Sequence, residues 1–195
     1  MKKVILTFLF LLFYNFAFAE ITNKDIKEFV DTMSKRSQSI VNNEKLTEKQ
    51  RQEEYKNFAS DIVDANWVAK FVLGRNWRDL TPAQQQEFLE LYREYLLQNY
   101  MPKIKDYNKE VKVDKIVKQK EKVFMVSLKT KDKTNRDVFV DFRLIDKDGK
   151  ILITDIIPEG ISFISNQRSD INSAISQNGY DKFIKSLRER VEKNK

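Results

Sequence analysis

The chain has 195 residues, with 36 basic and 29 acidic side chains, a formal net charge of +7, and neither histidine nor cysteine. These absences exclude disulfides, thiol nucleophiles and the usual zinc sites, and they remove the commonest general base. With only four glycines in the chain, no phosphate-cradling loop is visible. The composition therefore offers little for catalysis.

The first 19 residues have the pattern of a secretory signal peptide. Two lysines precede an apolar run from Val4 to Phe13, and Ala17-Phe18-Ala19 provides a small-x-small cleavage pattern before Glu20. A membrane anchor is the less favoured alternative, because a spanning helix needs about 20 apolar residues. We therefore expect a cleaved signal peptide over 1–19, export to the periplasm, and a single domain over 20–195.

Loss of Lys2 and Lys3 with the signal peptide leaves a net charge of +5. Such an excess gives weak attraction to anionic membrane surfaces or acidic partner proteins, although simple solubility explains it equally well. An exported protein rarely meets nucleic acid, so no nucleic-acid partner is expected.

The first half of the mature chain has the 3–4 spacing of apolar residues that is typical of amphipathic helices. A short, mostly apolar helix over 67–73 ends at Gly74, a plausible C-cap. The longest helix is expected to end at Tyr100-Met101-Pro102. The residues that cap the other helices are Thr22 or Asn23, Thr47, and Thr81 followed by Pro82.

From Val111 to Ile157 the apolar period changes to two, which indicates β-strands. Short charged links between the strands favour an antiparallel meander of about four strands. Pro158 and Gly160 end the last strand, and two short helices follow, one near Ser169–Gln177 and one from Tyr180. The predicted fold class is α+β, with helices packed on an antiparallel sheet.

One pair of carboxylates, Asp155 and Glu159, lies near the end of the sheet. Paired carboxylates can support acid–base chemistry. Residues of this kind more often cap a turn or pair with an arginine, and Arg168 is the candidate partner. We therefore favour a structural role for the pair.

Two sequence blocks carry a resemblance to a known family. The first comprises Val72-Leu73-Gly74, Trp77, Thr81-Pro82-Ala83-Gln84, Phe88, Tyr92-Arg93-Glu94-Tyr95-Leu96 and Tyr100. The second comprises Asp155, Glu159-Gly160-Ile161-Ser162, Arg168 and Asn178-Gly179. Together with the signal peptide and the order of elements, they resemble the MlaC family, the toluene-tolerance auxiliary proteins of ABC transport systems. One departure is Ile151 and Thr154, where the family often has tryptophan and another aromatic residue.

The resemblance implies a curved sheet packed with helices, similar to nuclear transport factor 2, and a periplasmic phospholipid-binding protein that is not an enzyme. Phospholipid would be the cargo, with no cofactor and no metal. The implied partners are an outer-membrane lipoprotein complex and an inner-membrane ABC transporter complex with a lipid-binding ring, between which the protein would carry lipid and keep the outer membrane asymmetric. The acyl chains would lie between sheet and helices.

Seven apolar residues are predicted to line the lipid site, four on the sheet and three on the helices. They are Phe124, Val126, Val140 and Phe142 on the sheet, and Trp67, Phe71 and Leu91 on the helices. One alternative function is a periplasmic chaperone or adaptor, which would expose its apolar surface to protein segments. Another is an enzyme, since fold alone does not fix function.

Overall fold

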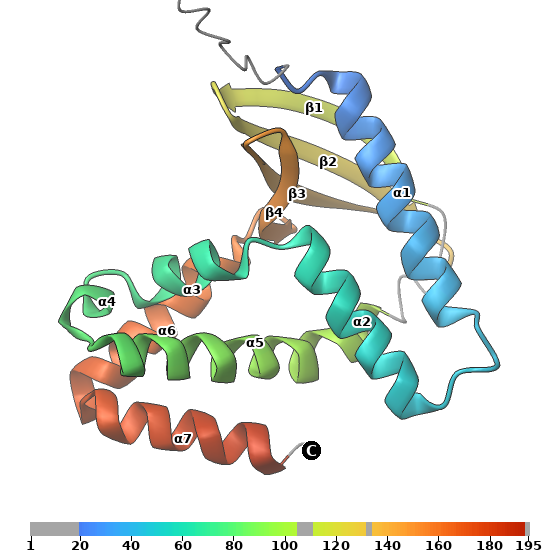
Figure 1. Ribbon diagram of the computed structural model, residues 1–195. Helices are drawn as coiled ribbons and strands as arrows, with labels where there is room; N and C mark the ends of the chain where they lie inside the picture. Colours follow the sequence, from blue (N-terminus) through green and yellow to red (C-terminus); the bar gives the residue numbers. More distant parts are fainter. Residues whose placement is uncertain (1–19, 105–110, 132–133, 194–195) are drawn as a thin grey trace, which may run out of the picture.

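The computed structural model describes residues 20–104, 111–131 and 134–193, and within them it shows helices packed on and beside one four-stranded antiparallel sheet (Figure 1). The α+β fold class is therefore confirmed. The predicted signal peptide, 1–19, lies outside the described residues. In chain order the elements are α1 (Asn23–Val41), α2 (Glu48–Ile62), α3 (Ala65–Leu73), α4 (Asn76–Asp79), α5 (Pro82–Ile104), β1 (Lys112–Lys120), β2 (Val123–Lys131), β3 (Asp137–Lys147), β4 (Lys150–Pro158), α6 (Phe163–Asn178) and α7 (Tyr180–Lys193).

The helix starts follow the capping residues found in the sequence. Thr22 caps α1, because its hydroxyl accepts the Asp25 N–H at 3.3 Å while the Asp25 carboxylate accepts the Thr22 N–H at 2.8 Å. Thr47 caps α2 in the same reciprocal way. α6 begins at Phe163, earlier than the predicted Ser169, because the Ser162 hydroxyl accepts the Ser165 N–H at 3.2 Å.

The end of α5 differs from the prediction by two residues. The helix continues to Ile104 instead of ending at Tyr100-Met101-Pro102. Proline removes one intrahelical hydrogen bond, but its fixed φ of about −65° is helical, so a helix can continue briefly beyond it.

The strands pair in sequence order, and the register of the sheet has one break that matters for the site. Leu144 of β3 lies opposite Ile153 of β4, whereas Arg143 lies opposite Asp155, so Thr154 is an extra residue in β4. Such a bulge bends the strand locally and changes which side chains face each other.

Two large hydrophobic cores hold the described part of the molecule together, and a smaller third cluster, Ile40, Tyr55 and Phe58, joins α1 to α2. α1 lies along one face of the sheet, where its Ile26 and Val30 pack against Phe124, Val126 and other apolar residues of the strands (Figure 1). The other core joins α3, α5, α6 and α7; its buried members are Val68, Ala69, Val72, Leu73, Phe88, Tyr92, Ile164, Ile171, Ile184 and Leu187. We call these two parts the sheet half and the helical half.

The segment between α2 and α3 joins the two halves at β4. Val63 forms a parallel bridge with Ile153, and the Asp64 N–H donates to the Ile153 carbonyl at 3.1 Å. The Asp64 carboxylate pairs with Lys147 at 2.7 Å and accepts the Trp67 N–H at the start of α3. Within the described ranges, no helix is both long and apolar enough to span a bilayer.

Candidate functional site

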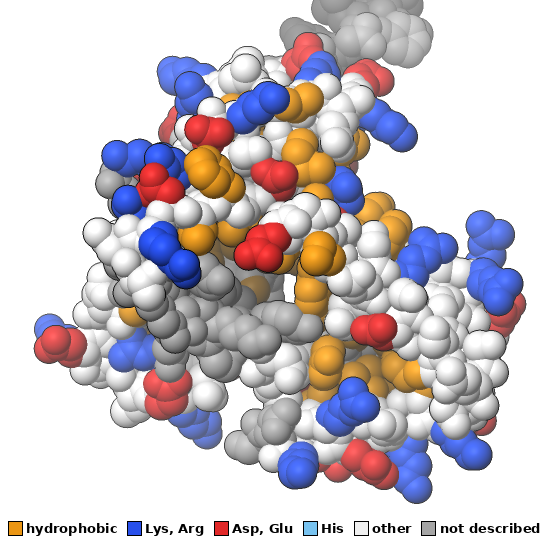
Figure 2. Space-filling model, turned by 180° about the vertical axis from the view of Figure 1, so that it is seen from behind, with side chains coloured by type: hydrophobic (Ala, Val, Ile, Leu, Met, Phe, Trp, Pro, Cys, Tyr) orange, Lys and Arg blue, Asp and Glu red, His pale blue; other side chains and the backbone are white. Residues whose placement is uncertain are grey.

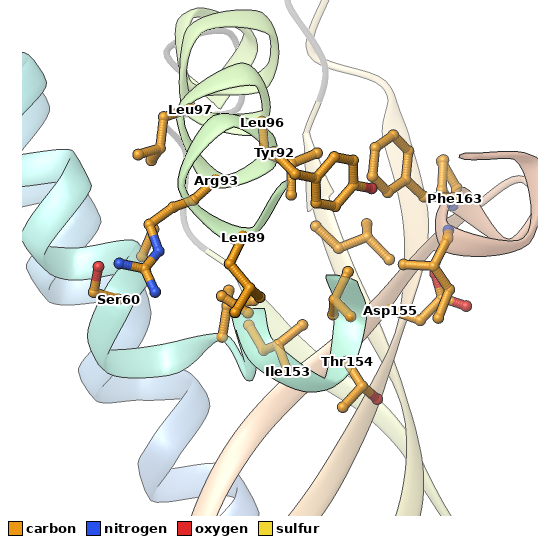
Figure 3. Close-up of a pocket in the computed structure, with 17 residues that line it drawn as sticks. Ser60, Leu89, Tyr92, Arg93, Leu96, Leu97, Ile153, Thr154, Asp155 and Phe163 are labelled. Atoms are coloured by element: carbon orange, nitrogen blue, oxygen red, sulfur yellow. The ribbon is translucent and has the colours of Figure 1, made fainter. Parts of the chain in front are cut away.

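A pocket of about 360 Å³ lies where β4 meets the helices (Figure 3). This volume falls in the range of about 300–1,000 Å³ that is usual for small-molecule sites. The lining residues come from α2 and the segment after it, from α3, α5 and β4, and from the start of α6. They are Ala59, Ser60, Val63, Ala65, Val68, Leu89, Tyr92, Arg93, Leu96, Leu97, Ile153, Thr154, Asp155, Ile156, Pro158, Phe163 and Ile164.

α5 supplies one wall through a single face. Its lining residues, Leu89, Tyr92, Arg93, Leu96 and Leu97, follow the i, i+3, i+4, i+7, i+8 spacing. This spacing places them on the same side of a helix. In Figure 3 they extend from α5 toward β4, α2 and the start of α6.

β4 supplies the opposite wall because it is covered on both faces. Leu152–Asp155 are buried in succession, which is unusual for a strand with one solvated face. α1 packs over the face of β4 that carries Ile153. Helices α3 and α6 of the helical half also contact β4 (Figure 1). The pocket therefore lies at the boundary between the two halves.

Most of the lining is aliphatic or aromatic. Val68, Tyr92, Ile153 and Ile164 are nearly inaccessible to solvent, so the inner part of the pocket is buried and apolar. The view from behind shows apolar side chains in recesses between the upper and lower parts of the molecule (Figure 2). A pocket of this composition suits a ligand with apolar chains, because each methylene removed from water contributes about 0.8 kcal/mol.

Asp155 is the buried charged residue of the lining, and its carboxylate is held in place by contacts with other residues of the protein. Its side chain pairs with Arg143 at 3.0 Å and accepts hydrogen bonds from the Ser162 hydroxyl at 2.7 Å and the Ile164 N–H at 3.2 Å. The prediction that Arg168 pairs with Asp155 is therefore wrong. The Arg168 guanidinium lies over the Phe71 ring, 4.9 Å from its centroid.

The two carboxylates of the sequence analysis do not form an acid–base pair. Glu159 is exposed in the turn after β4 with a φ of 52°, whereas Asp155 is buried and fully engaged. Among the described residues, no group of three or more acidic side chains is arranged to hold a metal ion. The site is thus an apolar pocket braced by one ion pair.

Comparison with known proteins identifies the family. The family model described as MlaC protein matches residues 21–189. The chain belongs to the MlaC family. No curated protein matches it. A similar solved structure is a phospholipid-binding protein from Ralstonia solanacearum in complex with a phospholipid, with a TM-score of 0.73 and 16% identity. The similarity covers 86% of this chain and 97% of that one, and shows that the MlaC fold is shared.

None of the seven residues predicted for the lipid site of this MlaC protein lines the 360 Å³ pocket. Phe124 and Val126 are buried beneath α1, and Phe142 packs, half-buried, against the same core. Val140 is half-buried on β3 and lies opposite Leu128 of β2. The four sheet residues thus follow one face of the sheet, and their contact with lipid stays a prediction.

The three predicted helix residues belong to the helical half. Phe71 and Leu91 are half-buried against its core. Trp67 is 38% exposed and stacks on Phe71, with ring centroids 5.1 Å apart. The sheet residues and the helix residues therefore pack against different cores, although they were predicted to face each other.

Sequence reasoning found only part of the pocket face of α5. The apolar stripe visible in the sequence, Phe88, Leu91, Tyr92, Tyr95 and Leu96, includes the lining residues Tyr92 and Leu96, but it leaves out Leu89 and Leu97, which also line the pocket. A helix with apolar residues on two faces is buried on both, and this signal is present in the sequence. The β4 wall has no comparable signal, because its burial depends on how the two halves meet.

Proposed function

We propose that this protein carries phospholipid in the periplasm between the outer and the inner membrane. The observation that carries the proposal is the apolar pocket between β4 and α5. Membership of the MlaC family and a shared fold with a protein described as phospholipid-binding support it. The signal-peptide pattern over 1–19 supports the location.

The pocket binds the acyl chains in this proposal. Each methylene that the pocket shields from water is worth about 0.8 kcal/mol before the cost of ordering the chain, so an acyl chain that fills the pocket is held strongly. Spontaneous escape into water is then negligible on the time scale of transport. A carrier of this kind has to release its cargo by direct contact with a partner that opens the pocket.

The partners in this proposal are the two membrane complexes that the family resemblance implies. An outer-membrane lipoprotein complex would exchange lipid with the carrier, and an inner-membrane ABC transporter complex with a lipid-binding ring would do so at the other membrane. The net charge of +5 on residues 20–195 would assist encounter with anionic surfaces, by attraction that weakens with salt. No enzymatic step is part of the proposal, because Asp155 is fully engaged in structure.

Solvent extraction of the purified mature protein tests the proposal. We expect mass spectrometry of the extract to show phospholipid in stoichiometric amount. Absence of phospholipid, together with binding of unfolded protein segments, would contradict the carrier and favour a chaperone or adaptor.

Two leucines on α5 provide a matched pair of variants for the same experiment. Leu89 and Leu91 are both half-buried against the core of the helical half, but only Leu89 lines the pocket. Leu89→Asp places a carboxylate in the apolar pocket, which costs several kcal/mol unless it is neutralised. We expect Leu89→Asp to lose its lipid and Leu91→Asp to retain it. Equal retention in the two folded variants would show that the chains lie elsewhere.

A further inference from the structure

One cation stands out in the otherwise apolar pocket. Its lining contains two charged residues, Asp155 and Arg93. The charge of Asp155 is offset by Arg143 at 3.0 Å. In the part of the chain that the structure describes, no carboxylate is placed to pair with Arg93, and its side chain is exposed. Arg93 is thus the charge of the pocket that remains uncompensated.

The acidic neighbours of Arg93 on α5 are already engaged. Glu94 pairs with Lys56 of α2 at 3.1 Å, and Glu90 accepts a hydrogen bond from Gln86 at 2.8 Å. The guanidinium is therefore available to an anionic ligand.

Arg93 also lies at the right place in the pocket for such a ligand. In Figure 3 it extends from α5 toward α2, and its guanidinium lies beside Ser60. Both side chains are exposed, whereas Tyr92 and Ile153 farther inside are buried. The Ser60 hydroxyl donates to the Lys56 carbonyl at 2.9 Å. The pocket is therefore apolar inside and cationic at its mouth.

We propose that Arg93 binds the phosphodiester group of the phospholipid whose acyl chains fill the pocket. The inference rests on the proposed function and names the part of the ligand that the pocket mouth recognises. A guanidinium is planar and always charged, and it donates two parallel hydrogen bonds to two oxygens of one phosphate. The contact recognises the phosphate shared by phospholipids and leaves the rest of the headgroup in solvent.

The experiment compares two lipids with identical dioleoyl chains, one with a phosphate and one without. Delipidated protein is incubated with detergent-dispersed phosphatidylglycerol or diacylglycerol, and native mass spectrometry measures the occupancy. We expect the wild type to prefer the phospholipid by at least about tenfold, the low end of the effect of a charge-assisted hydrogen bond. In Arg93→Gln that preference should disappear through loss of phospholipid, with diacylglycerol binding unchanged, and Arg93→Lys should restore part of it.

Two controls test whether the preference comes from Arg93 and the phosphate of a chain-bearing lipid. Arg78→Gln changes an exposed arginine on α4 that does not line the pocket, and it should leave the preference intact. Glycerol phosphate, which has the phosphate but no chains, should neither bind nor displace the phospholipid. Binding of glycerol phosphate that depends on Arg93 would overturn the proposal in favour of a site for free anions.

The remaining outcomes distinguish this inference from the proposed function. If the wild type binds both lipids equally, or if Arg93→Gln keeps the preference, the phosphate is not at Arg93, and the carrier function stands without this contact. If the folded wild type binds neither lipid, the carrier function fails and this inference fails with it.

Discussion

Removal of the Arg143 side chain tests how the pocket wall is held together. Arg143 lies opposite Asp155 only because Thr154 forms a bulge in β4. The Asp155 side chain is fully inaccessible to solvent, whereas that of Arg143 is 29% exposed. In Arg143→Met the carboxylate stays buried and loses its cation, which is the costly way to break an ion pair.

The expected loss follows from the partners that remain. Breaking a buried ion pair by removing one partner costs about 3–5 kcal/mol. The Ser162 hydroxyl and the Ile164 N–H still donate to Asp155 in the variant, so we expect the lower end, about 3 kcal/mol. For a domain of this size, that loss lowers Tm by about 6–12 °C. Circular dichroism during urea and thermal unfolding measures both quantities.

An exposed ion pair in the same sheet provides the control. Lys129 of β2 pairs with Asp137 of β3 at 2.8 Å, and their side chains are 42% and 39% exposed. Solvent screens such a pair, so Lys129→Met should change the stability far less than Arg143→Met. Equal losses in the two variants would refute the reasoning, because burial would then have no influence on the cost.

Three further predictions concern the helices and the release of lipid. Gly74 has a φ of +58°, and a Cβ added there would lie 2.9 Å from the Arg168 Nη2, whereas Gly160 has a φ of +79° with nothing within 4 Å of an added Cβ. Thermal unfolding should therefore show Gly74→Ala to be less stable than Gly160→Ala. Equal loss of stability in the two variants would contradict this. Burial, with help from nearby negative charge, raises the pKa of Tyr180 to about 12, and its hydroxyl donates to the Gln84 carbonyl at 3.1 Å. The folded state therefore favours the neutral phenol, and this stabilisation should decline from about pH 10 to 12 in the wild type but not in Tyr180→Phe, as measured by urea unfolding at each pH; identical pH profiles would count against it. Labelled phospholipid should stay with the protein for hours when acceptor vesicles are behind a porous membrane and should transfer quickly when the cognate membrane complex is added; fast loss to the separated vesicles would show an open lipid surface.

Local sequence signals predicted much of the fold. The reciprocal caps at Thr22 and Thr47 set the starts of α1 and α2 through contacts three residues apart. The alternation in β2 placed Phe124, Val126 and Leu128 on one buried face. These features depend on neighbours along the chain, so the sequence alone reveals them.

The partner of Asp155 could not be predicted in the same way. Without the bulge, the continuing register would place Thr154 opposite Arg143, and the ion pair would not form. A bulge depends on packing from both faces of the strand and has no simple residue signature. Arg143 and Arg168 are almost equally far from Asp155 along the chain, so sequence separation does not choose between them, and the structure places the Arg168 guanidinium over Phe71.

The position of the pocket also depends on long-range packing. The predicted sheet residues are apolar and share a face, as predicted, but α1 covers that face and packs directly on Phe124 and Val126. The 360 Å³ pocket forms instead where α5 meets β4. Which helix covers which part of a sheet depends on the paths of the connections, and apolar periodicity does not contain this information.

The position of the acyl chains tests the central claim most directly. A phospholipid with a photoreactive diazirine on one acyl chain can be loaded into the mature protein, activated by light, and its adducts located by peptide mass spectrometry. We expect adducts on the pocket walls, at Leu89 and Leu96 of α5 and at Phe163 of α6. Adducts confined to the sheet face beneath α1, at Phe124 or Phe142, would contradict this pocket as the lipid site.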